Sequence, residues 1–501
     1  ACTCRYCTES MRTLGMDPDD PEDRRRHRAK VCRDFADRTT QMVKDYDEDL
    51  VVTYNHRLGL GLTADLYDTM DYLVIESLPS GWGYMHTPMH ARYTRNYDRL
   101  TQGMTGAFHK VWGDFGTVKH ENQLKYELST SLIHHLPVSV GDQLRPRGVL
   151  EESKYDVIGD AFAFAKERKL PQADPLRDVA VVFPGHHDPA GQQASMDPDN
   201  PEMSAQGAVS ATKLLAETHQ QFDVLDEHFA NDILGEFDVA VLPNTGPLDE
   251  ETLDSLRSFV ADGGKLVATG TSTLAEDGFG LGDVFGVTSR GRLPYTTAYL
   301  DPGPYADGLP EMECVSYGPF QSIATDGAEA RGTVVAPTTE RSETRRFSHY
   351  QAPPERRLDV PAITHNEYGD GEAVYVGTNL FTQYYQEDYH GHRRLLDNLV
   401  TSLQDERTLA ADAPASVELN AMTTGDATYL HATNYHTSRA GEPISQITEV
   451  PPLSDVTATV RVPDASDASA VTDVGVDAEG DGDRVRVTFD TLRLHEIAKI
   501  E

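Results

Sequence analysis

Short apolar runs alternate with helical segments over most of this chain, and that alternation restricts its fold more than any other feature. Three such runs are Leu73–Ile75, Val179–Phe183 and Val239–Pro243, and each is followed by proline or a polar residue. Longer helical patterns lie between or after these runs, as at 121–135 and 249–262. Strand–helix alternation of this kind indicates βαβ units and a parallel sheet. We therefore expect an α/β protein.

Residues 1–170 carry four expected strands, near 50–54, 73–76, 100–104 and 137–140, each followed by a polar or glycine-rich loop. A (β/α)8 barrel needs eight strands and roughly 250 residues. This segment therefore predicts the C-terminal half of a TIM (β/α)8 barrel, with an unusual half-sheet as the alternative.

Two further units follow the first. Residues 175–405 show the order of a doubly wound, open α/β sheet, with further strands near 265–270 and 373–377. Residues 412–501 show short strands near 427–434, 456–462, 485–489 and 492–497, separated by Gly, Asp and Pro turns. That pattern predicts a small antiparallel β-sandwich.

The charge balance excludes several partners. The 501 residues include 81 acidic and 44 basic side chains, for a formal net charge of −37. Nucleic-acid binding needs a basic surface, and anionic membranes attract basic segments, so we expect neither partner. No run approaches 18 apolar residues, so no membrane span is expected. Five cysteines do not make a disulfide framework.

The same composition bears on habitat. Scattered carboxylates with little lysine resemble proteins of salt-loving archaea, in which acidic surfaces keep the protein hydrated. No signal peptide is visible, and we expect a cytoplasmic protein. The chain begins at Ala1 rather than Met, which is compatible with a targeting segment upstream.

Glu76 is the first candidate for a catalytic residue. It ends the apolar run Leu73–Ile75, and the loop after it carries Trp82 and Tyr84 among prolines and glycines. Catalytic groups of β/α barrels lie where the strands end. Aromatic rings beside a carboxylate suit a sugar, whose C–H faces stack on rings while its hydroxyls need hydrogen bonds. The structural alternative is a glutamate that caps a neighbouring helix.

Other polar and aromatic residues fall in the same expected loops. Histidines there can hold sugar hydroxyls or can be structural, and the chain's only two tryptophans can serve as sugar platforms or fill the core. Asp114 could accept a hydrogen bond from a sugar, whereas Asp142 could instead pair with Arg145 or Arg147. The candidate substrate-binding residues are His56, Trp82, Tyr84, His86, Trp112, Asp114 and Asp142.

Cys2, Cys4 and Cys7 form a C-x-C-x-x-C cluster. Three thiolates this close could share a Zn²⁺ ion, which favours four tetrahedral ligands. The fourth would be Cys32 or a residue upstream. The alternative is three reduced thiols in a loop.

Several blocks carry a family resemblance. The stretches 76–84, 103–106, 112–116 and 141–144 resemble the barrels of glycoside hydrolase family 151, α-L-fucosidases related to family 29. The middle unit resembles the trimerisation domain of family 42 β-galactosidases, whose sheet is glutamine-amidotransferase-like. Leu242–Thr245 shows no nucleophilic cysteine at the position an amidotransferase would need.

The resemblance implies a retaining glycosidase that acts on terminal glycosides, with α-L-fucosides first. Such enzymes use two carboxylates about 5–5.5 Å apart. It implies Glu76 as the acid/base and, as the nucleophile, an Asp on a strand that would precede Ala1 in an N-terminally truncated member. It also implies a homo-oligomer, in particular a trimer, no cofactor for catalysis, and a structural zinc ion. A β-galactosidase-like enzyme and a non-catalytic oligomerising or sugar-binding protein remain the alternatives.

Overall fold

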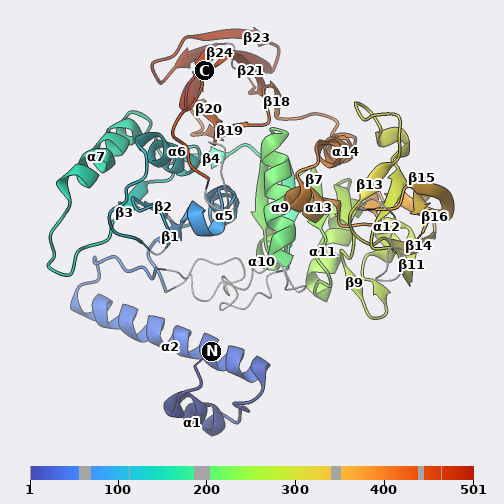
Figure 1. Ribbon diagram of the computed structural model, residues 1–501, viewed down its shortest axis with the longest axis horizontal. Helices are drawn as coiled ribbons and strands as arrows, with labels where there is room; N and C mark the ends of the chain where they lie inside the picture. The colour runs from blue at the N-terminus through green and yellow to red at the C-terminus, as the bar shows by residue number, and fades with distance from the viewer. Residues whose placement is uncertain are drawn as a thin grey trace.

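The computed structural model of the protein describes residues 2–55, 69–111, 113–184, 204–339, 351–437, 445–463, 465 and 467–501. Figure 1 shows a parallel-sheet unit and a larger mixed-sheet unit side by side, with a β-sandwich across one end. No helix in the described ranges is both long enough and apolar enough to cross a membrane.

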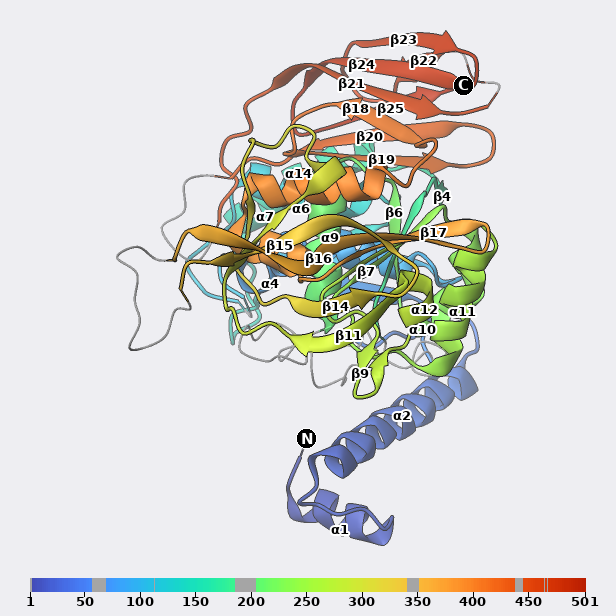
Figure 2. The same cartoon turned by 90° about the vertical axis from the view of Figure 1, so that its right-hand side faces the viewer.

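Two helices form an arm that projects from the body at the N-terminus, and Figures 1 and 2 agree on this placement. They are α1 (Arg5–Thr13) and α2 (Pro21–Tyr46). Lys44 of α2 ties the arm to the body through an ion pair with Asp71, at 2.9 Å between Nζ and Oδ2.

The strand expected at 50–54 is wrong. Residues 51–54 belong to no strand. Val52 makes two hydrogen bonds with Asp71 and Thr53 makes one with Tyr72, and only one of these three bonds joins two backbone groups. Isolated bonds do not make the continuous ladder that defines a strand.

The described part of the first unit therefore contains three parallel strands. They are β1 (Leu73–Glu76), β2 (Thr101–Gly106) and β3 (Val138–Gly141), in the order β1-β2-β3. The accompanying helices are α4 (Pro79–Trp82), α5 (His86–Thr94), α6 (Glu121–Leu132) and α7 (Glu152–Glu167). All three strands end at the same edge, so the loops after them lie together.

Helix α5 is enclosed by its neighbours, because every residue from Thr87 to Thr94 is buried. A helix buried on all sides must neutralise its charged groups internally. Arg92 donates to Glu418 at 2.8 Å, and Arg95, just past the helix end, donates to Asp223 at 2.5 Å. These two pairs connect the first unit to the sandwich and to the middle unit.

The middle unit is built on a nine-stranded sheet, in the order β13-β12-β15-β16-β17-β8-β7-β5-β6. Its parallel portion runs β6-β5-β7-β8-β17, and the remaining strands extend it in antiparallel fashion. The strands are β5 (Val179–Val182), β6 (Phe222–Leu225), β7 (Val239–Pro243), β8 (Lys265–Thr269), β12 (Ala298–Asp301), β13 (Cys314–Ser316), β15 (Glu329–Pro337), β16 (Pro354–Tyr368) and β17 (Gly371–Val376).

Helices and two small sheets complete this unit. The helices are α9 (Ser204–Glu217), α10 (Glu227–Ile233), α11 (Glu250–Ala261), α12 (Gly282–Phe285), α13 (Leu380–Glu387) and α14 (His390–Thr401), with short 3-10 turns η1 (Leu234–Glu236) and η2 (Gly303–Tyr305). The small sheets pair β9 (Leu274–Ala275) with β10 (Gly278–Phe279) and β11 (Val287–Arg292) with β14 (Gln321–Thr325).

The C-terminal unit consists of two antiparallel sheets. One is β18-β21-β24-β23 and the other is β22-β25-β20-β19-β4, where β4 (Asp174–Pro175) comes from the connection after α7. The other strands are β18 (Leu409–Asp412), β19 (Val417–Thr423), β20 (Thr428–Asn434), β21 (Leu453–Arg461), β22 (Ala468–Ala470), β23 (Val476–Asp481), β24 (Arg484–Leu492) and β25 (His495–Ile500). The strand expected at 492–497 has different bounds, because β24 ends at Leu492 and β25 covers His495–Ile500.

The cores do not follow these units strictly. One continuous hydrophobic core includes Leu73 and Ile75 of β1 together with the parallel strands of the middle unit, whereas the sandwich has a core of its own. The division at residues 170–175 and 405–412 therefore stays a prediction.

Candidate active site

Glu76 is the last residue of β1, at the edge where the three parallel strands end. It lies beside Met104 of β2, which in turn lies beside Ser139 of β3. Side chains at the same level of a parallel sheet point to the same face, and successive residues alternate between faces.

The surroundings of Gly103 show toward which face of the sheet the Glu76 side chain points. A Cβ added at Gly103 would collide with Ser131 of α6, so this side of β2 faces the helices. Met104 and its neighbour Glu76 therefore point to the opposite face. In a β/α barrel that face is the interior, which holds the catalytic groups at its C-terminal end.

Trp82 and His86 are brought together in the loop after β1. Their rings stack with centroids 5.0 Å apart and an angle of 25°, and His90 extends the column with its ring 4.0 Å from that of His86. His90 Nδ1 lies 2.8 Å from the carbonyl oxygen of His86. Burial lowers the pKa of His86 well below its ordinary value and that of His90 to about 4, so both rings are neutral near pH 7.

Tyr84 lies in a different environment. Its ring packs against Tyr126 of α6 and Tyr435 of the C-terminal unit, with centroids 5.6 and 5.4 Å away. Its hydroxyl accepts a hydrogen bond from Gln123 Nε2 at 3.1 Å. Burial raises the pKa of Tyr84. The ring thus joins the first unit to the sandwich, and a sugar contact for Tyr84 stays a prediction.

The carboxylate of Asp114 organises its own loop. Its Oδ1 accepts hydrogen bonds from Thr117 Oγ1 at 2.6 Å and from the backbone N–H groups of His109 and Lys110 at 3.1 and 3.4 Å. Burial opposes ionisation here, but these hydrogen bonds outweigh it and lower the pKa of Asp114. Asp114 is therefore ionised near neutral pH and is largely committed to the loop.

Asp142 pairs with neither of the arginines expected. Lys154 of α7 donates to its Oδ1 at 2.8 Å, and the two side chains are 4% and 5% exposed. Arg145 pairs with Glu151 instead. The expected pairing with Arg145 or Arg147 is therefore wrong. The true partner, Lys154, lies on the following helix, and the spacing of residues in the sequence did not indicate that this helix packs against Asp142.

Two candidate residues, His56 and Trp112, lie outside the described residues. Two further loop histidines have structural contacts. His120 accepts a hydrogen bond from the N–H of Asn122 and so caps α6, and the backbone N–H of His109 donates to Asp114.

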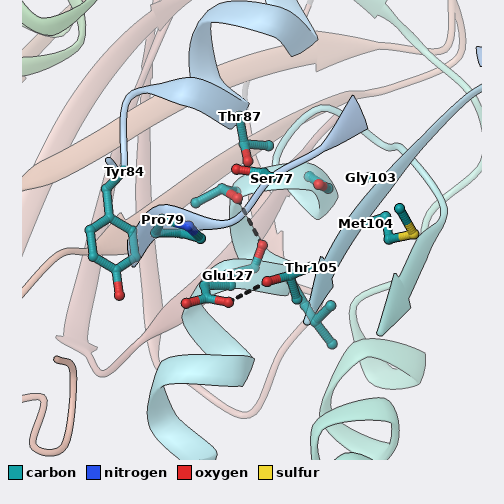
Figure 3. Close-up of a pocket in the computed structure, with 11 residues that line it drawn as sticks. Ser77, Pro79, Tyr84, Thr87, Gly103, Met104, Thr105 and Glu127 are labelled. Atoms are coloured by element: carbon teal, nitrogen blue, oxygen red, sulfur yellow. Dashed lines mark hydrogen bonds between the residues drawn. The ribbon is translucent and has the colours of Figure 1, made fainter. Parts of the chain in front are cut away.

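A buried polar network lies behind the strand ends, between the sheet and α6. Lys119 Nζ is 2.6 Å from Glu127 Oε2, which also accepts from Thr105 Oγ1 at 2.5 Å, and Gln123 Nε2 donates to Glu127 Oε1 at 3.2 Å. Figure 3 shows Thr105 and Glu127 joined across this space, with Ser77 near them. The network ties the loop after β2 to α6 and, through Gln123, to Tyr84.

The network borders a cavity of about 10 Å³, lined by residues that include Ser77, Thr87, Thr105, Glu127 and Ser131. This volume is close to the minimum for one water molecule. A sugar cannot enter it. The cavity is therefore a structural space behind the sheet, on the face opposite Glu76.

The three N-terminal cysteines converge. The sulfur atoms of Cys2, Cys4 and Cys7 lie within 4.8 Å of one another, the one such group of three metal-ligand side chains in the described residues. Tetrahedral Zn–S bonds of about 2.3 Å place sulfurs somewhat under 4 Å apart. The thiol set therefore fits three corners of a zinc site.

No family model matches the chain. Among solved structures, the α-L-fucosidase isoenzyme 2 from Paenibacillus thiaminolyticus is 26% identical with a TM-score of 0.88, and the match covers 100% of this chain and 75% of that one. The chain has the fold of a glycoside hydrolase.

More distant structures agree on this fold. The β-galactosidase from Bacillus circulans sp. alkalophilus is 16% identical with a TM-score of 0.66, over 96% of this chain and 68% of that one. The polyextremophilic β-galactosidase from the Antarctic haloarchaeon Halorubrum lacusprofundi is 17% identical with a TM-score of 0.59, over 96% and 67%. The glycoside hydrolase expected from the sequence is thereby supported at the level of fold.

Sequence reasoning missed His90 and the Lys119–Glu127 pair. The spacing of His86 and His90, four residues apart on one helix, was a usable signal. The ion pair joins a loop to the following helix, and periodicity alone does not reveal such contacts.

Proposed function

We propose that the protein is a retaining glycoside hydrolase that acts on terminal glycosides, with α-L-fucosides as its substrate class. The observation that carries the proposal is the position of Glu76 at a strand end, in a chain whose full length matches an α-L-fucosidase structure.

Glu76 is the acid/base in this proposal. It donates a proton to the leaving oxygen and then takes a proton from the water that hydrolyses the glycosyl-enzyme. The nucleophilic carboxylate comes from a strand outside residues 1–501. Trp82, stacked on His86, offers a flat ring at the same strand end, and His56, Trp112, Asp114 and Asp142 are the other proposed sugar contacts.

The proposal also covers the oligomeric state of the protein and the binding of a metal ion. The middle unit mediates formation of a trimer, and Cys2, Cys4 and Cys7 hold a structural zinc ion with a fourth ligand from Cys32 or from outside the chain. Zinc would cross-link the N-terminal segment and takes no part in the proton transfers.

The test is the Glu76→Gln variant of the full-length protein, assayed in high salt on aryl α-L-fucosides, β-D-galactosides and α-L-arabinosides. Loss of the acid should slow substrates with poor leaving groups by 100-fold or more, since general acid catalysis contributes roughly 10²–10⁴-fold. Activated aryl glycosides should be much less affected in the first step. Added azide, which needs no general base, should restore turnover of the activated substrates.

Glu121→Gln is the matched control, because this exposed glutamate on α6 pairs with Lys125 at the surface. Equal and small effects of both substitutions would remove Glu76 from the mechanism. Faster hydrolysis of galactosides than of fucosides would favour the β-galactosidase alternative. Sugar binding without turnover on any substrate would favour a non-catalytic protein.

A further inference from the structure

Three histidines from distant parts of the chain form a continuous hydrogen-bonded row at the seam between the first unit and the sandwich. His135 follows α6, and His431 and His495 lie on the paired strands β20 and β25. His135 Nε2 is 2.9 Å from His431 Nε2, and His431 Nδ1 is 3.0 Å from His495 Nε2. His431 and His495 are fully buried and His135 is 9% exposed.

The hydrogen positions in this row follow from its end at Pro171. His135 Nδ1 lies 2.6 Å from the carbonyl oxygen of Pro171, which can only accept, so His135 Nδ1 carries the hydrogen. A neutral His135 then accepts at Nε2, so His431 must donate from Nε2 and accept at Nδ1. His495 donates from Nε2, and its buried Nδ1 has no hydrogen-bond partner. The three rings therefore fit together when all are neutral.

Position 135 supports a specific role for the side chain. His135 has a φ of 58°, in the left-handed region, at the C-terminal end of α6 where glycine is favoured. A histidine here accepts a conformational cost that glycine would avoid. In return, both of its ring nitrogens are used, one with the carbonyl oxygen of Pro171 and one across the seam with His431.

Protonation cannot be accommodated without loss. A charged His431 would carry hydrogens on both nitrogens, so it could keep its hydrogen bond to His495 only if the hydrogen of His495 moved from Nε2 to Nδ1, where it would be buried without an acceptor. A proton on His495 Nδ1 would break no bond, but it would leave a buried cation near Arg168, whose Nε donates to the backbone oxygen of His495. Burial lowers the pKa of all three rings, and Arg168 lowers that of His495 further.

The charged surroundings mostly disfavour a further positive charge. The ionisable groups on the neighbouring elements are His134 after α6, Arg92 of α5, Arg95 just after α5, Arg168 after α7, Glu418 of β19, Tyr429 of β20, and Glu496 and Lys499 of β25. Glu418 is already paired with Arg92, and Glu496 lies near Arg168 and Arg493. Among the described residues, neither of these two carboxylates is therefore left to compensate an imidazolium in the row.

We propose that this histidine row is an acid-sensitive lock, which holds the C-terminal sandwich against the end of α6 while all three rings are neutral and releases it as they take up protons. The direction follows from linkage. Rings whose pKa is lower in the docked state bind fewer protons there, so docking is favoured above about pH 6.5 and weakens as the pH falls. Opening takes up as many as three protons from the row. This inference does not depend on the proposed glycosidase activity.

The test is hydrogen–deuterium exchange of the full chain between pH 7 and pH 4, reported as protection factors. Peptides covering 133–140, β20 and β25 should lose protection at a higher pH than peptides from β5, β7 and β8. His495→Gln keeps an N–H donor but removes one proton-binding ring. Opening of this variant should take up about one proton fewer than opening of the wild type. The slope of the logarithm of the opening constant against pH should be smaller by that amount. His228→Gln, on an exposed position of α10, is the control and should change nothing.

A second measurement does not depend on how the variants fold. Nitrogen-15 spectra of the wild-type histidines at pH 7 should show His431 neutral with its hydrogen on Nε2, with the signal assigned in wild-type chain labelled only in the segment that contains His431. A charged His431 at pH 7 would overturn the proposal. An unchanged pH dependence in His495→Gln, or simultaneous loss of protection at the seam and in the middle sheet, would also overturn it.

Discussion

Lys119 Nζ lies 2.6 Å from Glu127 Oε2, and the two side chains are only 2% and 3% exposed. This pair fastens the loop after β2 to α6, directly behind the strand ends that carry Glu76. Thr105 and Gln123 bond to the same carboxylate. The pair is therefore part of the structure that positions the candidate site.

Breaking this pair should destabilise the protein strongly. Lys119→Met leaves a buried carboxylate without its cation, and we expect the free energy of unfolding to fall by about 3–5 kcal/mol. Lys125→Met is the matched control, since Lys125 pairs with Glu121 at a surface where both partners are more exposed, and should cost under about 1 kcal/mol. Urea denaturation measures both, and equal losses would contradict the central role of the buried pair.

His90 should make stability fall in acid. Its pKa is lowered to about 4 in the folded protein, against an ordinary value of 6.5, so the unfolded chain binds more protons between these limits. Stability from His90 is therefore present above pH 6.5 and lost as the pH falls to about 4, with a maximum of about 3 kcal/mol. His90→Gln should reduce the difference in unfolding free energy between pH 7 and pH 4, as measured in urea.

The control for that experiment is His390→Gln, which changes an exposed histidine. An identical pH dependence in wild type and His90→Gln would show that His90 is not held neutral by its surroundings.

Zinc should bind at the N-terminal cysteines with a spectroscopic signature. Substitution by Co²⁺ should give the thiolate charge-transfer absorption of a sulfur-rich tetrahedral site, and Cys4→Ser should weaken or abolish it. Cys314→Ser, which removes a buried cysteine far from the cluster, should leave it intact. Metal content near zero in the wild-type protein after purification with Zn²⁺ would refute the site.

Salt should stabilise the protein. A net charge of −37 repels itself, and raising the salt from 0.1 M to 1 M shortens the screening length from about 10 Å to about 3 Å. We expect Tm to rise by about 5 °C or more over this range. Calorimetry in KCl, compared with a neutral osmolyte at the same water activity, separates screening from exclusion effects. A Tm that does not respond to KCl would contradict this expectation.

The local sequence pattern was sufficient to predict those helices and strands whose formation depends mainly on neighbouring residues in the chain. The helical pattern at 249–262 corresponds to α11 (Glu250–Ala261), which begins where the Asp249 side chain accepts a hydrogen bond from the N–H of Thr252. The strand ending at Glu76 was likewise recognisable from its apolar run. The sequence pattern failed where pairing with another strand decides the structure. Residues 51–54 have the composition of a strand but form no continuous ladder of backbone hydrogen bonds with a neighbour.

The environment of the candidate site depended on distant parts of the chain. Tyr84 packs against Tyr435, and Asp142 pairs with Lys154 rather than with either nearby arginine. Residues 493 and 494 separate β24 from β25 and so divide the stretch 492–497, which reads as one strand in the sequence. Each of these outcomes is set by tertiary contacts, which a single sequence does not display.

The burial of α5 means that the first unit is not a module that can be cut away. Removing the rest of the protein would strip Arg92 and Arg95 of Glu418 and Asp223 and open the most enclosed helix to solvent. Truncation at the apparent boundary near residue 170 would therefore yield an insoluble or unfolded fragment, and engineering of the loop beside Glu76 has to carry all three units along.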